Sequence, residues 1–419
     1  MSTSQPVQTR SRRERPLSFA FLSSIVSLLA VFVASSAPIP LYNTYRAEDG
    51  LSNADISLAI VVYGLSVLAA LLFMGRVSNY LGRRATAIAS LLLLIVGCAL
   101  FLNVHEAGTL LVARTLMGLG AGIASSNLTA YSVDAAPAKT SALAAIATSQ
   151  LPMLGLAIGA VLSGGLVELG FAPRQLSYIF SGAMLAASVA LIALSPETAP
   201  RKPGVWRSLR PTLAIPARLL PLLPVATAVY LATWATGAFF QAFVPALVSD
   251  ELQTRSPLVL GLVFASYMAS SAVGAALSTR LSPAAAQRAG MLAFLAGMVG
   301  IVFAIVTGAL LAFVIATIVA GASQGVAISA ATRALLSGAM LSERAPILSV
   351  IYLVSYTATV LPSLLAGQLS NVFTLPQIAV GYGILAAVAT LVTLVAAKNP
   401  VPENRTLRAP NSATAPTTH

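Results

Sequence analysis

The sequence predicts an all-α membrane protein in which twelve transmembrane helices form two pseudo-symmetric six-helix bundles. Composition, the spacing of apolar stretches and a weak internal repeat predict this class. Hydrophobic residues make up 57% of the 419 residues, and charged residues make up only 9%. A soluble domain usually carries about 25% charged residues. We therefore expect lipid, rather than water, to surround much of the surface of this protein.

A helix needs roughly 20 apolar residues to cross the hydrocarbon core of a bilayer. Stretches almost free of Asp, Glu, Lys and Arg predict eight single spans, at about 17–45, 56–75, 85–104, 108–133, 140–167, 175–196, 219–249 and 256–279. Two further stretches, 289–332 and 345–397, are too long for one helix each. We expect them to fold back at Thr307–Gly308 and at Asn371–Pro376, which gives twelve spans.

The first span has an alternative interpretation as a cleaved signal peptide. Four arginines precede the apolar run, and Ala34-Ser35-Ser36-Ala37 resembles a cleavage site. The run is long, Pro38 follows at once, and many spans come after. We therefore expect an uncleaved first helix.

Basic residues predict the orientation, because cytoplasmic loops are enriched in Lys and Arg. With the N-terminus inside, cytoplasmic segments hold 20 of the 24 basic residues, whereas outer loops hold only Arg46, Arg174 and Arg255. We expect a multi-pass inner (plasma) membrane protein with both termini in the cytoplasm. The net charge of +12 is then a signal of topology, and nucleic acid is not an expected partner.

The longest polar interruption, at 197–218, separates two groups of six expected spans. With the two terminal tails, the chain then has five parts. We expect a cytoplasmic tail at 1–16, a six-helix bundle at 17–196, a cytoplasmic linker at 197–218, a second six-helix bundle at 219–397 and a cytoplasmic tail at 398–419.

The two halves also match each other at a nearly constant offset. A shift of 204 or 203 residues superposes several pairs: Tyr63 on Tyr267, Arg76 on Arg280, Arg84 on Arg288, Gly118 on Gly321, Gly122 on Gly325 and Gly164 on Gly367. Two like-oriented halves related by an axis along the membrane normal are one repeat pattern of secondary transporters.

The loop after the second span contains Gly75, Asn79, Gly82, Arg83 and Arg84. It resembles the signature loop of the major facilitator superfamily, roughly Gly-x-Leu-x-Asp-Arg-x-Gly-Arg-Arg. The alternative is an ordinary basic loop that obeys the charge rule. In the family, the acidic residue belongs to a cytoplasmic gate between the bundles. Asn79 stands in its place and cannot form an ion pair, so the resemblance implies a weaker gate.

Two further motifs resemble those of this family. The fourth span contains Arg114-Thr-Leu-Met-Gly-Leu-Gly, which resembles a motif of proton-coupled members. The fifth span places glycines as exporters do, but has Ala160 where exporters carry proline; these glycines are Gly155, Gly159, Gly164 and Gly165. Small residues at this spacing also allow close helix packing on their own.

Arg114 is the only ionisable residue that we place inside the membrane. A central arginine costs about 2.5–3.5 kcal/mol on insertion scales, so it usually faces a partner or a cavity. By resemblance, it faces the central cavity and influences proton coupling or the binding of an anion. Alternatively, it snorkels to the outer interface. No carboxylate lies within a span. The nearest are Asp55 and Glu168, and the alternative for each is an ordinary charged residue of a loop.

In the family, helices 1, 4, 7 and 10 line the cavity. Their polar or aromatic residues here are Ser35, Asn127, Tyr230, Trp234, Gln241, Ser323 and Gln324, with Gln150 on the fifth span as a further candidate. Each could instead hydrogen-bond between helices. A cavity with one cation, amides and aromatics fits a neutral or anionic amphipathic compound.

The resemblance implies a monomeric secondary active transporter that works by alternating access, with proton-coupled export favoured. Uptake of a small organic metabolite and a non-transporting membrane sensor are the alternatives. Cys98 alone cannot form a disulfide framework, and no nucleophile–base pair, metal set or phosphate-binding loop lies in a span. We therefore expect no enzyme, no metal and no cofactor. The expected partners are a small-molecule substrate, protons and membrane lipids.

Overall fold

The computed structural model describes residues 8–137, 141–211, 213–337 and 339–400. Within them, twelve helices are long and apolar enough to cross a membrane, and no strand occurs. The outer parts of the two expected tails, 1–7 and 401–419, lie outside the described residues.

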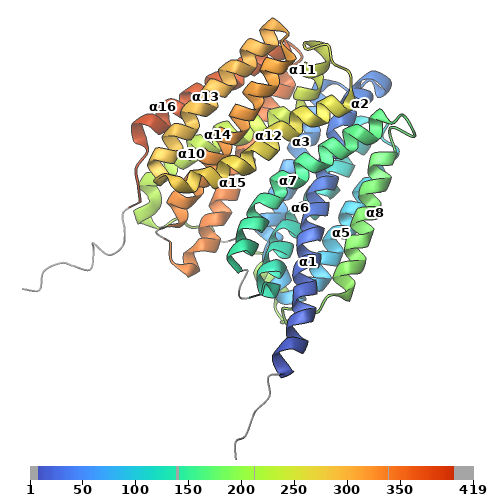
Figure 1. Cartoon of the computed structure of the whole chain (residues 1–419), viewed down its shortest axis with the longest axis vertical. Coiled ribbons are helices and arrows are strands. Elements are labelled where there is room, and N and C mark those ends of the chain that lie inside the picture. The colour runs from blue at the N-terminus through green and yellow to red at the C-terminus, as the bar shows by residue number, and fades with distance from the viewer. Residues whose placement is uncertain (1–7, 138–140, 212, 338, 401–419) are drawn as a thin grey trace, which may run out of the picture.

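The first six long helices form one bundle: α1 (Gln8–Ser36), α3 (Asn53–Ala69), α5 (Arg83–Phe101), α6 (Ala107–Ala135), α7 (Ser141–Glu168) and α8 (Leu176–Leu194). The other six form the second: α10 (Leu223–Ala242), α12 (Pro257–Leu277), α13 (Pro283–Thr307), α14 (Leu310–Leu336), α15 (Leu341–Leu369) and α16 (Leu375–Ala396). Figure 1 shows the two groups side by side.

Shorter elements join these helices. They are the helices α2 (Tyr42–Asp49), α4 (Ser78–Leu81), α9 (Val205–Ser208) and α11 (Val244–Asp250), the 3₁₀ turns η1 (Ile39–Leu41), η3 (Ala217–Leu222) and η4 (Ser278–Arg280), and the π-helical turn η2 (Ala70–Met74), which continues α3.

Both expected fold-backs are confirmed. Gly308 ends α13 with φ of 67°, a left-handed conformation that glycine adopts without steric cost. The second turn lies between α15 and α16, where the Thr374 side chain accepts a hydrogen bond from the Gln377 backbone and caps the new helix.

Two of the expected spans are shorter than the apolar stretches that predict them. The stretch 17–45 breaks after Ser36, and 219–249 breaks at Phe243. Pro38 and Pro245 follow these breaks, and proline lacks the N–H that would continue the hydrogen bonds of the preceding helix. The separate helices α2 and α11 therefore follow α1 and α10.

The internal repeat is visible in the packing of the helices. A Cβ on Gly118 of α6 would lie 2.5 Å from the Tyr63 carbonyl oxygen of α3. A Cβ on Gly321 of α14 would lie 2.3 Å from the corresponding oxygen of Tyr267 on α12. The two bundles thus use the same glycines at the same contacts, which explains the constant offset in the sequence.

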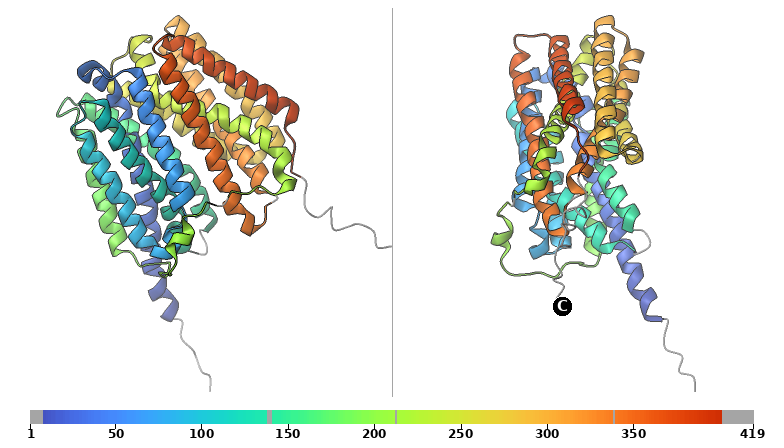
Figure 2. Two further views of the ribbon diagram at one scale, coloured as in Figure 1. Left: turned by 180° about the vertical axis from the view of Figure 1, so that it is seen from behind. Right: turned by 90° about the vertical axis from the view of Figure 1, so that its left-hand side faces the viewer.

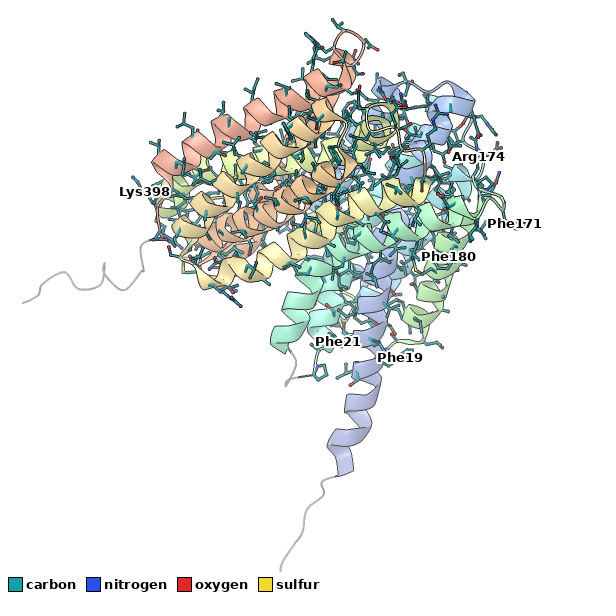
Figure 3. All side chains as sticks on the ribbon, turned by 45° about the horizontal axis from the view of Figure 1, so that its top comes forward. Phe19, Phe21, Phe171, Arg174, Phe180 and Lys398 are labelled. Atoms are coloured by element: carbon teal, nitrogen blue, oxygen red, sulfur yellow. The ribbon has the colours of Figure 1, made fainter. Side chains whose placement is uncertain are left out.

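The bundles touch mainly along two pairs of helices, α7 with α12 and α3 with α15, with smaller contacts of α3 with α10 and of α2 with α11. In the left view of Figure 2, they meet at one end and diverge toward the other. We call the end with α2 and α11 the closed end, and the end where α1 begins and α16 ends the open end. In Figure 3, Phe171 and Arg174 lie at the closed end of the first bundle, whereas Phe19 and Phe21 lie toward its open end.

Candidate substrate and coupling site

Arg114 lies in the interior of the first bundle and is 0% exposed. Its Nη1 donates a hydrogen bond to the Ser35 carbonyl oxygen at 2.9 Å, and its Nη2 donates to the Tyr42 hydroxyl. Its Nε forms no hydrogen bond with any residue that the structure describes. The alternative in which Arg114 snorkels to the interface is therefore wrong, because the side chain is enclosed.

Aromatic rings surround the Arg114 guanidinium. Its central carbon lies 5.4 Å from the ring centre of Tyr42, 5.5 Å from that of Tyr63 and 5.7 Å from that of Phe101. Arg114 forms no ion pair with any residue that the structure describes. Cation–π attraction, which strengthens when the cation is desolvated, therefore takes the place of a carboxylate.

The two hydrogen-bond acceptors of Arg114 lie on either side of the break after α1. The Ser35 carbonyl belongs to the last turn of that helix, where carbonyl groups lack helical partners and the helix dipole is negative. Tyr42 is the first residue of α2. Arg114 thus links the end of α1 to the start of α2.

A cluster of aromatic side chains, which we call the aromatic cluster, lies where α3, α10 and α15 approach one another. Trp234 of α10 packs edge-on against Tyr356 of α15, with ring centres 5.1 Å apart. Tyr356 also approaches α3, since a Cβ on Gly64, the neighbour of Tyr63, would lie 3.9 Å from Tyr356 Cδ1. Since Tyr63 also borders Arg114, the cluster connects the arginine to the face between the bundles.

The aromatic cluster has unused hydrogen-bonding capacity. The Tyr230 hydroxyl pairs with Thr332 Oγ1 at 2.8 Å. The Trp234 indole nitrogen, by contrast, is buried and has no partner in the part of the chain that the structure describes. A buried donor without an acceptor is costly, so this N–H is available to a bound molecule.

Sequence reasoning found Tyr230 and Trp234 but missed the tyrosines of α3 and α15. The internal repeat points to Tyr63 only as the counterpart of Tyr267. Tyr352 and Tyr356 lie four residues apart and therefore on one face of α15. That spacing was the available signal, but only the packing of α15 on α3 and α10 shows where this face points.

The remaining predicted cavity residues lie elsewhere. Gln324 Oε1 accepts a hydrogen bond from the Tyr267 hydroxyl at 2.7 Å, and the Tyr267 ring stacks on Phe240 at 4.1 Å, all within the second bundle. Ser323 bonds only to carbonyl oxygens of its own helix. Gln150 and Gln241 are half-buried on α7 and α10.

Asn127 lies at the open end of α6, away from the aromatic cluster. Its side-chain amide donates a hydrogen bond to the Arg83 carbonyl oxygen at 2.9 Å. The structure therefore places Asn127 beside the signature loop, where it ties α6 to the start of α5.

The signature loop turns at Gly82, whose φ of 94° favours glycine. Arg83 forms an ion pair with Asp134 at 2.9 Å and donates to Ser78 Oγ at 2.6 Å. Asn79 is exposed. A Cβ on Gly75 would lie 2.5 Å from the Leu71 carbonyl oxygen.

A linker carboxylate that sequence reasoning missed completes this loop. Glu197 accepts hydrogen bonds from the backbone N–H groups of Arg83 at 2.7 Å and Arg84 at 3.1 Å. These are the first residues of α5, whose N–H groups lack helical partners. The acid that the loop lacks at Asn79 is thus supplied at a neighbouring position from 114 residues further along the chain.

Three of the four glycines of α7 lie at close contacts with two other helices. A Cβ on Gly155 would lie 2.6 Å from Phe32 Cβ, and one on Gly159 would lie 2.2 Å from the Val33 carbonyl oxygen, both on α1. Gly164 instead approaches α12 of the other bundle, 2.3 Å from the Pro257 carbonyl oxygen. Gly165 has room, since its nearest neighbour atom would be 3.9 Å away.

Twelve apolar helices in two matching bundles define a multi-pass inner-membrane protein with the architecture of secondary transporters. The chain belongs to the Major Facilitator Superfamily, which its residues 17–329 match. The members of this family are transporters rather than enzymes.

Known relatives match only part of the chain. The "Quinolone resistance protein NorA" of Staphylococcus aureus (strain MRSA252) is 23% identical over 158 residues, which are 38% of this chain and 40% of that protein. The "Multidrug resistance protein MdtL" of Klebsiella pneumoniae subsp. pneumoniae is 27% identical over 164 residues, again 38% and 40% of the two chains. Each match thus spans less than half of the relative.

Proposed function

We propose that this protein exports a small neutral or anionic amphipathic molecule by alternating access, driven by protons. The observation that carries the proposal is the aromatic cluster on the face between the bundles, with Arg114 directly behind it. Aromatic rings bind flat apolar groups, the Trp234 indole offers a free N–H, and the guanidinium favours negative charge. A cationic substrate would meet no compensating carboxylate at Arg114.

The direction and the coupling are supported by relatives and motifs. The names of the two relatives above refer to drug resistance, which favours export. Arg114 and the glycines after it resemble the motif of proton-coupled family members. A proton is therefore the ion that we propose for exchange.

The orientation follows from the distribution of basic residues, which puts both termini in the cytoplasm. In that orientation, the open end faces the cytoplasm and the closed end faces outward. The bundles at 17–196 and 219–397 then rock about the aromatic cluster in a single chain, joined by the linker at 197–218.

Transport into inverted membrane vesicles tests the proposal. The compound panel should contain neutral, anionic and cationic aromatic molecules of similar size. We expect neutral or anionic compounds to accumulate when the vesicle interior is acidic, and a protonophore to abolish that accumulation. Absence of gradient-dependent flux for every compound, with correctly folded protein, would contradict the proposed function.

A further inference from the structure

Polar contacts bridge the two bundles at the closed end. Asn43 of α2 donates to the Pro245 carbonyl oxygen of α11 at 2.8 Å, and Arg46 pairs with Asp250 at 2.9 Å. Among the ion pairs of the described residues, Arg46–Asp250 alone joins the bundles. A third bridge, formed by Glu168, differs from these two because it ends on a transmembrane helix.

Glu168 is the last residue of α7, and its carboxylate lies at the start of α12. Its Oε2 accepts hydrogen bonds from Ser256 Oγ at 2.9 Å and from the Leu258 backbone N–H at 3.4 Å. Ser256 is the N-cap of α12, and its Oγ also accepts from the Val259 N–H. The N-terminus of a helix favours negative charge and has N–H groups without helical partners. A carboxylate of one bundle thus caps a helix of the other.

The repeat supplies a matched site for comparison. Ser256 corresponds to Ser52, the N-cap of α3, at an offset of 204. There the carboxylate comes from Asp55 of the same helix, which accepts from the Ser52 N–H at 2.9 Å and from its Oγ at 2.7 Å. The residue of α12 that corresponds to Asp55 is Val259, which has no carboxylate. Equivalent helices are therefore capped from within in one bundle and across the interface in the other.

The contact of Glu168 depends on the close approach of α7 and α12. One turn before it, a Cβ on Gly164 would lie 2.3 Å from the Pro257 carbonyl oxygen. On the facing helix, a Cβ on Gly261 would lie 2.3 Å from the Ala160 carbonyl oxygen. Separation of these helices at the closed end would remove the Glu168 carboxylate from α12. The Asp55 contact, within one helix, would survive.

We propose that Glu168 is a latch that stabilises the closed end and is released when the bundles part there. It is a positioning residue, which acts on the equilibrium between conformations rather than on the substrate. The inference rests on alternating access, which is part of the proposed function. It gives Glu168 a contact between the bundles, whereas Asp55 caps its own helix.

Thiol labelling of a buried reporter tests the latch. Ser363 of α15 is 0% exposed, and its carbonyl oxygen accepts a hydrogen bond from Ser57 Oγ across the interface at 2.6 Å. Ser363→Cys in a Cys98→Ala background therefore becomes reactive when the bundles part. The labelling rate is measured on purified protein in detergent without substrate.

We expect Glu168→Ala and the volume-matched Glu168→Gln to raise the labelling rate, with Ala reaching about fivefold, the effect of one charge-assisted cap. Glu106→Ala is the control, because this closed-end carboxylate contacts Thr109 of its own helix at 3.3 Å, and it should leave the rate unchanged. An unchanged rate in both Glu168 variants, or an equal rise in Glu106→Ala, would overturn the latch. Because no substrate is used, faster labelling in a protein without transport activity would count against the proposed function and not against the latch.

Discussion

Arg114 is a permanent cation enclosed by aromatic rings and held by a helix-end carbonyl and a tyrosine hydroxyl. A buried charge without a carboxylate costs free energy unless such contacts offset it. This unfavourable buried charge lies next to the aromatic cluster, which indicates that Arg114 has a role other than packing. The corresponding residue of the other bundle, at an offset of 203, is Thr317, which is also 0% exposed.

Arg114→Ala should abolish proton-driven uptake into inverted vesicles while leaving membrane insertion intact. The substitution removes the charge and leaves the Ser35 carbonyl and the Tyr42 hydroxyl without their donor. Thr317→Ala is the matched control, because the Thr317 hydroxyl forms no hydrogen bond within the described part of the chain. Unchanged flux in Arg114→Ala would remove this residue from the mechanism.

Trp234→Phe should raise the KM for substrates that carry a hydrogen-bond acceptor by about fivefold, since one net hydrogen bond is worth about 1 kcal/mol. The ring is kept and only the indole N–H is lost. Trp206→Phe, in the linker and 79% exposed, provides the control. Equal KM values in wild type and Trp234→Phe would show that the indole does not contact substrate.

At the scale of helices, glycines set the distance between α7 and its neighbours. Gly155 and Gly159 bring α7 against α1, and Gly164 brings it against α12. A single helix therefore contacts its own bundle with one part and the opposite bundle with another. Side-chain volume added at the second contact should act on the closed end specifically.

Gly164→Ala should lower the thermal denaturation midpoint and raise labelling at Ser363→Cys, because the new methyl group would overlap the Pro257 carbonyl oxygen. Overpacking of this kind costs about 1–3 kcal/mol. The adjacent Gly165→Ala is the control, since its Cβ would have 3.9 Å of clearance. Similar midpoints and labelling rates for the two variants would contradict the assignment of Gly164 to the interface.

Helix α2 is fixed at the closed end by a second set of charges. Arg174, between α7 and α8, pairs with Glu48 at 2.7 Å and with Asp49 at 2.6 Å. Burial lowers the pKa of Arg174, but its hydrogen bonds with both carboxylates raise that pKa above its ordinary value. Since Arg174 stays charged, α2 moves with the first bundle, and the bridges from Asn43 and Arg46 to α11 are the ones that must break.

The sequence predicted the elements better than it predicted their contacts. Apolar length located all twelve spans, and Gly308 and Pro376 marked two turns, because these signals are local. The contacts of Glu197 with α5 and of Glu168 with α12 join residues 114 and 88 positions apart. No pattern within one helix encodes such a pairing. The aromatic cluster was missed in part for the same reason, since it takes rings from α3, α10 and α15.

For the whole molecule, the divergence of the bundles in Figure 2 and the proposed alternating access together predict one change. The open end should close while the closed end parts. Both movements can be followed by distances between spin labels on exposed residues of opposite bundles in the Cys98→Ala background.

Labels at Val133 and Met340, at the open end, should move closer when substrate and a proton gradient are supplied in reconstituted vesicles. Labels at Leu169 and Gln253, at the closed end, should move apart. Val133 with Leu194, both in the first bundle, is the control pair and should keep its distance. A change in only one of the two inter-bundle pairs would argue against rocking of rigid bundles.

The repeated architecture also explains how a costly residue can be accommodated. Each half builds the same contact between its second and fourth long helices, through Gly118 in one and Gly321 in the other. The fourth helix carries Arg114 in the first half and the uncharged Thr317 at the matching position in the second. Because the scaffold is duplicated, one half can carry a buried charge at this position while the other half keeps the same helix packing with an uncharged side chain.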